Sequence, residues 1–379
     1  MVFRNSLVAF IGFALSSAAF GQGVSVLGNN GANLSQLKIT TVADAKVGLN
    51  APSDIGFNPK KPTEMYVVNH ADNASVVVTL DTAGKMLKSR VATGLGSEHF
   101  MPYPTAIAFA PKGFFATIHD IDTITQDSTP ADFMGPSLWR VDWFEGGHAS
   151  HIDMLHNSPS GIGIAWVYGN TYIVNDGYHG SLTVYDFRND HNYGGADHSD
   201  GVALRYADGL LKRVEGVPSG VVYDNAAGIA YAVDTGNNRL VSIDLGLDLL
   251  SKSGFDYVSI KNKDYKVTRN IAPNYDGSIQ RYVDGAVLNT VVDGKKNGLV
   301  TPSGLALQGD LLYVSDFATG QITAFSKDGK VVDTLNLASL SPALANVAIS
   351  GIEFDTEGNL FIADLLNNKI YRLSASSSR

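Results

Sequence analysis

The histidines are the residues best suited to metal or acid–base chemistry, and seven of the nine lie between His119 and His198. A neutral imidazole binds Zn²⁺ and similar ions, and it also transfers protons near pH 7. We expect His70, His99, His119 and His156 to form a metal site, with His119 and His156 as catalytic groups. No His-x-x-x-His spacing supports this site, so it depends on a fold that brings the four together. The alternative is that they are hydrogen-bonded loop histidines.

A glycine-rich acidic segment at residues 190–201 is a second candidate cation site. Asp190, Asp197 and Asp200 supply carboxylates on a flexible backbone, which suits Ca²⁺. The segment does not match the EF-hand pattern, and the alternative is a solvated turn held by Asp side chains. It follows an expected strand at 182–187, so we expect it on the opposite face from His119 and His156. Folding back onto their site is the alternative.

A repeated unit must position these candidates, and it begins with Pro-Ser-Gly or a close variant followed by a short apolar strand. The six units begin at Pro52, Pro104, Pro159, Pro218, Pro302 and Ile349. A second apolar strand follows in each unit and ends in a polar residue, namely Asn69, His119, Asn175, Asp234, Asp316 or Asp364. Six units of about 50 residues, each a short meander, predict an all-β, six-bladed β-propeller.

The sixth unit has only three expected strands before the Ser-rich end of the chain. Residues 34–43 alternate as a strand does, and we expect them to complete the last blade and close the ring. Closure removes the open sheet edge that invites aggregation. The expected organisation is a tail at 22–33, the propeller at 34–373 with an insertion at about 246–300, and a tail at 374–379. A separate small domain is the alternative for the insertion.

Two turns in these units resemble the turn of NHL repeats. They are Asp-Thr-Gly-Asn-Asn-Arg at 234–239 and Asp-Leu-Leu-Asn-Asn-Lys at 364–369, in which Asp ends the second strand and a basic residue starts the third. The resemblance covers roughly residues 45 to 375 and implies a six-bladed propeller. Such propellers include peptidyl-hydroxyglycine lyases, streptogramin lyases, gluconolactonases and pure binding modules, so the resemblance does not fix the chemistry.

The up-and-down connectivity of a propeller blade brings the start of its first strand and the end of its second strand to the same mouth of the central channel. We therefore expect Asn69, Asn175, Asp234, Asp316 and Asp364 to bind substrate there, beside the histidines. The alternative is that these Asp and Asn side chains accept hydrogen bonds from the backbone of their own turns.

The N-terminus reads as a secretory signal peptide at residues 1–21. Arg4 supplies the positive charge, and the apolar run at 7–20 is too short for a comfortable membrane span. A retained anchor is the alternative. We expect a secreted or periplasmic protein, with no further membrane span and a monomeric state. The net charge of −9 argues against nucleic acid as a partner, and the absence of cysteine excludes disulfides and thiolate chemistry.

No serine-hydrolase elbow, phosphate-binding loop or dinucleotide-binding fingerprint is present. The expected function is a metal-assisted lyase or hydrolase that acts on a small extracellular substrate at the channel mouth, with Zn²⁺ or Ca²⁺ as the ion. The first alternative is a non-catalytic secreted module that binds a peptide or glycan on the same face. A structural surface component is a weaker alternative.

Overall fold

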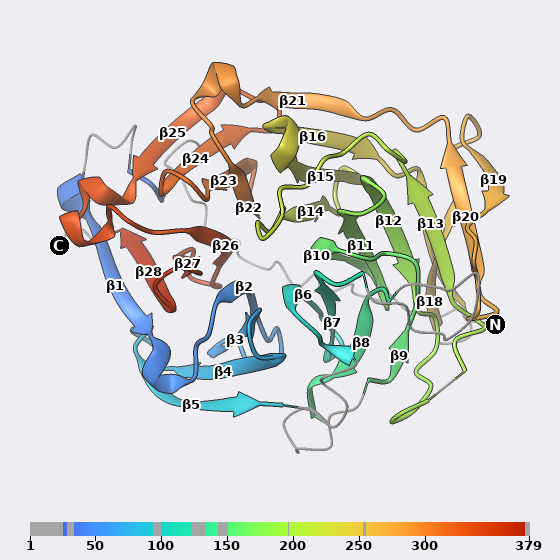
Figure 1. Ribbon diagram of the computed structural model, residues 1–379, viewed down its shortest axis with the longest axis horizontal. Coiled ribbons are helices and arrows are strands. Elements are labelled where there is room, and N and C mark those ends of the chain that lie inside the picture. Colours follow the sequence, from blue (N-terminus) through green and yellow to red (C-terminus); the bar gives the residue numbers. More distant parts are fainter. Residues whose placement is uncertain are drawn as a thin grey trace, which may run out of the picture.

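The computed structural model describes residues 26–28, 34–93, 100–122, 134–142, 151–195, 197–252 and 255–375. The expected signal peptide and His99 lie outside these residues. Six sheets of four or more strands stand around a central axis, and the chain passes through them in order (Figure 1). The protein is therefore an all-β, six-bladed β-propeller. No helix in the described ranges is long and apolar enough to cross a membrane.

The blades are numbered along the chain, from the innermost strand of each blade to its outermost. Blade 1 is β2 (Pro52–Phe57), β3 (Glu64–Asn69), β4 (Ala74–Leu80) and β5 (Met86–Ala92). Blade 2 is β6 (Pro104–Ala110), β7 (Phe114–His119), β8 (Ser137–Arg140) and β9 (Asp153–Met154). Blade 3 is β10 (Gly161–Tyr168), β11 (Thr171–Asp176), β12 (Ser181–Asp186) and β13 (Val202–Tyr206).

The other three blades include the two departures from a simple meander. Blade 4 is β14 (Val221–Asp224), β15 (Ile229–Asp234), β16 (Arg239–Asp244) and β21 (Asn289–Asp293). Blade 5 is β22 (Pro302–Gln308), β23 (Leu311–Asp316), β24 (Gln321–Ser326) and β25 (Val331–Asn336). Blade 6 is β26 (Ile349–Phe354), β27 (Leu360–Asp364), β28 (Lys369–Ala375) and β1 (Leu37–Ala43).

The N-terminal strand closes the ring, as the sequence predicts. β1 pairs antiparallel with β28, from Leu37 opposite Ala375 to Ala43 opposite Ile370 (Figure 1). Blade 6 therefore combines strands from both ends of the chain, and its outer edge is formed by β1.

The long connection between β16 and β21 adds strands outside the regular blades. β17 (Leu247–Lys252) and β18 (Phe255–Ile260) form a separate hairpin. β19 (Lys266–Asn270) and β20 (Ile279–Asp284) extend blade 3 to six strands, with β20 parallel to β13. Val258 and Val283 are buried in the hydrophobic cluster that blades 3 and 4 share. This connection therefore packs against the propeller.

The core lies between blades, because both faces of most sheets are covered by neighbours. One cluster combines Ile55 and Val67 of blade 1 with Phe361 and Ile370 of blade 6. The second strands are consequently apolar on both faces, as in the buried run 65–68 of β3. Alternating polar positions would place unpaired polar groups against the next blade.

A ring of buried hydrogen bonds links neighbouring blades at the end where each inner strand begins. Ser53 Oγ of blade 1 donates to the Pro104 carbonyl of blade 2 at 2.7 Å. Thr105 Oγ1 of blade 2 donates to the Gly161 carbonyl of blade 3 at 2.6 Å. Asn175 Nδ2 of blade 3 donates to the carbonyl of Ser219 at the start of blade 4 at 3.1 Å.

The same ring continues through the remaining blades and returns to the first. Thr235 Oγ1 of blade 4, itself bonded to Ser219 Oγ, donates to the Pro302 carbonyl at 2.7 Å. Ser303 Oγ donates to the Ile349 carbonyl at 2.6 Å, and Ser350 Oγ donates to the Pro52 carbonyl at 2.8 Å. The residue at the second position of the Pro-Ser-Gly repeat thus donates the hydrogen bond at four of the six blade junctions, which explains why a hydroxyl recurs there.

We predict that Ser350→Ala lowers the free energy of unfolding by about 1–3 kcal/mol, because the Pro52 carbonyl loses its buried donor at the junction that closes the ring. Denaturant unfolding measures the change. Ser350→Thr keeps a hydroxyl, as Thr105 does in blade 2, and should retain more stability. Ser89→Ala on the outer strand β5 is the exposed control. Equal losses in Ser350→Ala and Ser89→Ala would refute a structural role for the ring.

Candidate functional site

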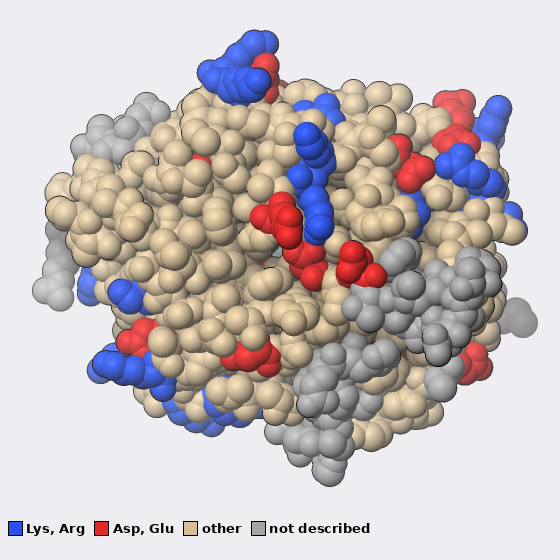
Figure 2. Space-filling model, viewed as in Figure 1, with Lys and Arg blue, Asp and Glu red and all other residues tan. Residues whose placement is uncertain are grey.

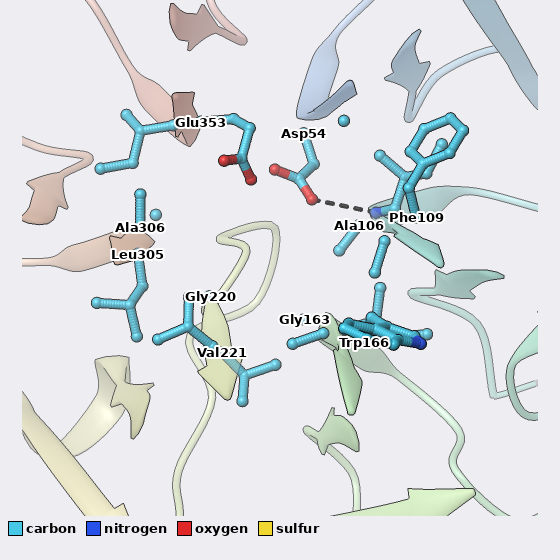
Figure 3. Close-up of a pocket in the computed structure, with 18 of the residues that line it drawn as sticks. Asp54, Ala106, Phe109, Gly163, Trp166, Gly220, Val221, Leu305, Ala306 and Glu353 are labelled. Carbon is cyan, nitrogen blue, oxygen red and sulfur yellow. Dashed lines mark hydrogen bonds between the residues drawn. The ribbon is translucent and has the colours of Figure 1, made fainter. Parts of the chain in front are cut away.

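The central channel holds a cavity of about 450 Å³ that residues of all six inner strands line. Its wall is mostly apolar and includes several aromatic side chains, among them Phe57, Phe109, Trp166, Tyr223 and Phe354. Two acidic residues, Asp54 and Glu353, also line it, and none of the described lining residues is Lys or Arg. Figure 3 shows the two carboxyl groups close together and facing each other on one side of this cavity.

The two acids meet because blade 6 is the neighbour of blade 1. Asp54 lies on β2 and Glu353 on β26, and these inner strands are adjacent across the closure of the ring. The blades approach closely here, since a Cβ on Gly351 would lie 2.6 Å from Asp54 Oδ1. Gly351 therefore makes room for the Asp54 carboxyl group.

The environment of this acidic pair favours the protonated carboxyl groups. Burial raises the pKa of Asp54 to about 8, and the nearby charge of Glu353 adds to the effect. The Ile107 N–H, which donates to Asp54 Oδ2 at 3.1 Å, opposes it. Burial also raises the pKa of Glu353 to about 7. Near neutral pH, the pair therefore holds a proton that two ordinary surface carboxylates would release.

The mouth where the inner strands begin is covered by the connection between blades 3 and 4. Arg213 of this connection pairs with Asp120 of blade 2 at 2.6 Å. Gly216 and Val217 come next to Ser53 and leave a cavity of only about 10 Å³. In Figure 1 the yellow-green segment before β14 reaches the middle of the ring, and Figure 2 shows acidic and basic side chains close together near the centre of the same view.

The six strand-ending residues lie at this covered mouth, buried and hydrogen-bonded. Asn69 donates to the Gly48 carbonyl at 2.7 Å, and Asn175 belongs to the hydrogen-bond ring. Asp234 accepts from the Lys212 N–H at 2.8 Å and from Arg239 at 2.7 Å.

Asp316 and Asp364 likewise hold their own blades together. Asp316 accepts from four backbone N–H groups, including that of Val300 at 2.6 Å. Asp364 accepts from the Ala348 N–H at 3.1 Å and from Asn367 Nδ2 at 2.7 Å. The predicted substrate-binding carboxylates are thus placed where their oxygen atoms satisfy turns rather than face the cavity.

Among the described residues, His70, His119 and His156 do not come together as a group of three potential ligands for one ion. His70 is half-buried beside Tyr103, with the ring centres 5.7 Å apart. His119 is buried, with Nε2 3.0 Å from Thr117 Oγ1. His156 is buried against Asp276, which comes from the segment between β19 and β20.

The three acids of the predicted second cation site also have separate partners. Asp190 pairs with Arg140 at 3.3 Å, and Asp197 accepts from the Ser199 N–H at 3.0 Å. Asp200 accepts from Asn189 Nδ2 at 2.8 Å. The described carboxylates of this trio do not converge into a ligand group.

Asp54 and Glu353 are not among the site residues predicted from the sequence, although the repeat contains a signal for the first. The third position of the Pro-Ser-Gly motif is Gly in units three to six and Ala in unit two, but unit one has Asp54. An acidic side chain at a position that Gly or Ala otherwise occupies indicates a special environment. Glu353 gives no comparable signal, since only the closure of the ring brings it to Asp54.

We predict that Asp54→Asn flattens the dependence of stability on pH. A carboxyl group whose folded pKa is raised binds its proton more tightly in the native state, so the native protein loses stability as pH rises from about 4 to 8. The variant lacks this loss. The difference in free energy of unfolding, variant minus native protein, should therefore be about 1–2 kcal/mol larger at pH 8 than at pH 5. Denaturant unfolding at several pH values measures it. The exposed Glu357→Gln change is the control, and the same pH slope in Asp54→Asn and the native protein would contradict the assignment.

No known sequence family matches this chain, and no curated protein does. Among solved structures it is similar to auxiliary nutrient binding proteins of Bacteroides ovatus and Bacteroides thetaiotaomicron, both with a TM-score of 0.52 and 13% identity. These matches cover 89% and 90% of this chain and 76% and 77% of the others. A luciferin-regenerating enzyme matches with a TM-score of 0.51 and 11% identity, over 90% of this chain and 96% of its own. At these identities the likeness shows the propeller fold.

Proposed function

We propose that this propeller binds a small molecule carrying a protonated amine in its central channel. The observation that carries the proposal is the pair of carboxyl groups, Asp54 and Glu353, facing each other in a cavity with no Lys or Arg among its described lining residues. Such a pair has no counter-charge of its own, and a cationic ligand supplies it.

The rest of the cavity suits an amine on an apolar or aromatic body. Its volume of about 450 Å³ lies in the range of small-molecule sites. Phe109 and Trp166 line the wall, and aromatic faces attract cations as well as apolar groups. The ligand enters from the end of the channel lined by Asn58 and Thr356, since the opposite mouth is covered.

A lyase or hydrolase acting at the same pair is the second candidate. Burial raises the pKa values of Asp54 and Glu353 to about 8 and about 7, so one group can be protonated while the other is ionised near neutral pH. This is the requirement for a general acid and a general base in one site. No described residue that lines the cavity is histidine, so this candidate uses carboxyl chemistry.

We further propose that the protein acts outside the cytoplasm as a monomer. The signal-peptide pattern at residues 1–21 supports export. The description of two similar structures as auxiliary nutrient binding proteins is consistent with capture of a small molecule there. This proposal differs from the peptide or glycan partner expected from the sequence, because it places a small molecule inside the channel and not at the mouth where the inner strands begin.

We predict that a panel of small amines contains a ligand whose affinity rises about tenfold between pH 6 and pH 8. Only the ionised pair attracts the cation, and the raised pKa values of Asp54 and Glu353 place that ionisation in this range. Isothermal titration in two buffers of different ionisation enthalpy measures both the affinity and the protons released on binding.

Matched variants test whether amine binding depends on the carboxyl pair in the channel or on exposed acidic residues elsewhere. Asp54→Asn and Glu353→Gln should weaken amine binding at least tenfold, whereas Glu357→Gln, an exposed acid four residues after Glu353, should not. Neutral polyols and carboxylates of equal size serve as ligand controls. Amine binding that is unchanged in both channel variants, or an affinity independent of pH, would overturn the proposal.

A further inference from the structure

A second group of side chains lies at the outer edge of the junction between blades 2 and 3. Asp153 belongs to β9, the outermost strand of blade 2, whereas His191 and His198 belong to the connection between β12 and β13 of blade 3. One potential ligand atom from each of the three lies within 4.8 Å of the other two. Figure 1 shows β9 next to the strands of blade 3.

The connection reaches blade 2 because it folds back across the junction. The Gly194 N–H donates to the His151 carbonyl at 3.1 Å, and Arg140 of β8 pairs with Asp190 at 3.3 Å. A Cβ on Gly201 would lie 2.6 Å from a Leu155 methyl carbon, so the glycine permits this close approach. The segment therefore packs against the outer strands of blade 2.

Two buried polar atoms in this group face each other without a hydrogen bond. Asp153 is completely buried, and neither its Oδ2 nor His191 Nδ1 has a hydrogen-bond partner among the described residues. The two atoms are 3.8 Å apart, which is too long for a hydrogen bond. Two atoms that each lie about 2.1 Å from a tetrahedral ion are about 3.4 Å apart, so the observed gap is close to that of two metal ligands. A buried carboxylate oxygen without a partner otherwise costs stability.

The surrounding contacts are those that support metal-binding histidines. His191 Nε2 lies 2.9 Å from Asp200 Oδ1, so a carboxylate lies beside its second ring nitrogen at ion-pair distance, although the two atoms are not aligned as a hydrogen bond. The Asp200 carboxylate is held in turn by Asn189 Nδ2 at 2.8 Å. His198 Nδ1 lies 2.6 Å from Asp153 Oδ1, so these two proposed ligands contact each other directly, and binding of an ion would replace this contact. A ligating imidazole usually has such a carboxylate on its other nitrogen, which fixes its tautomer and raises its basicity.

We propose that Asp153, His191 and His198 bind one Zn²⁺-type divalent ion that links blade 2 to blade 3. Two neutral imidazoles and one carboxylate match the ligand preference of Zn²⁺, whereas Ca²⁺ prefers oxygen ligands. Three protein ligands leave a fourth position for water. The side chains of His191 and His198 are 14% and 11% exposed, so an ion can reach the site from solvent. The site is independent of the carboxyl pair in the channel.

The test is metal binding by the purified full chain after chelator treatment. Titration with ZnCl₂ alone should give one ion per chain and raise the melting temperature, because the ion binds only the folded arrangement. Co²⁺ in its place should give the visible absorption of a site with nitrogen and oxygen ligands. The absence of a stoichiometric Zn²⁺ ion at micromolar concentration would overturn the proposal.

Variants identify the ligands and guard against misfolding. His191→Gln and His198→Gln should weaken Zn²⁺ at least about 100-fold, and Asp200→Asn about 10–100-fold through His191. Both histidines are partly exposed, so these variants are expected to fold, and circular dichroism checks this. His179→Gln is the matched control, because His179 also pairs with a buried carboxylate, that of Asp176, but outside the group. Equal Zn²⁺ affinity in the ligand variants and in His179→Gln would refute the site.

Discussion

The ring of hydrogen bonds between neighbouring blades is the constraint on which the architecture depends. Each blade offers a hydroxyl or amide donor to a carbonyl of the next, and Ser350 returns the ring to Pro52. These groups are buried, so an unmade bond would leave a carbonyl without a partner in a site that water does not reach. The number of blades and their mutual tilt must therefore bring the last blade to the first.

The channel chemistry follows from this closure. The hydroxyl position of the repeat holds neighbouring blades together, and the next position, usually glycine, lets them approach. Asp54 occupies this close-packed position in the first blade and faces Glu353 of the last. Burial then raises the pKa values of both groups, and the charge of Glu353 adds to the effect on Asp54. The same packing that stabilises the propeller thus creates a pair of carboxyl groups that titrate near neutral pH.

Irregular connections determine which parts of the propeller are accessible. The segment before β14 covers one mouth, so the strand-ending Asp and Asn side chains there serve the fold. The segment before β13 instead crosses to blade 2 and brings His191 and His198 to Asp153. Both segments lie within blades 2 to 4, the part of the chain that departs most from the repeat. A regular repeat builds the scaffold, and its interruptions place side chains that the repeat cannot.

The sequence by itself determined the six blades and the closing strand, because the recurring Pro-Ser-Gly starts and paired apolar strands are local patterns that each blade repeats. It also placed Asp234 and Asp364 at turn positions, with turn hydrogen bonding as the alternative to substrate binding. Only the tertiary structure decided that Asp54 meets Glu353 and that Asp153 meets His198. These partners are 299 and 45 residues apart (353 − 54 and 198 − 153). Their contact depends on ring closure and loop direction, and neither leaves a periodic signal in the chain.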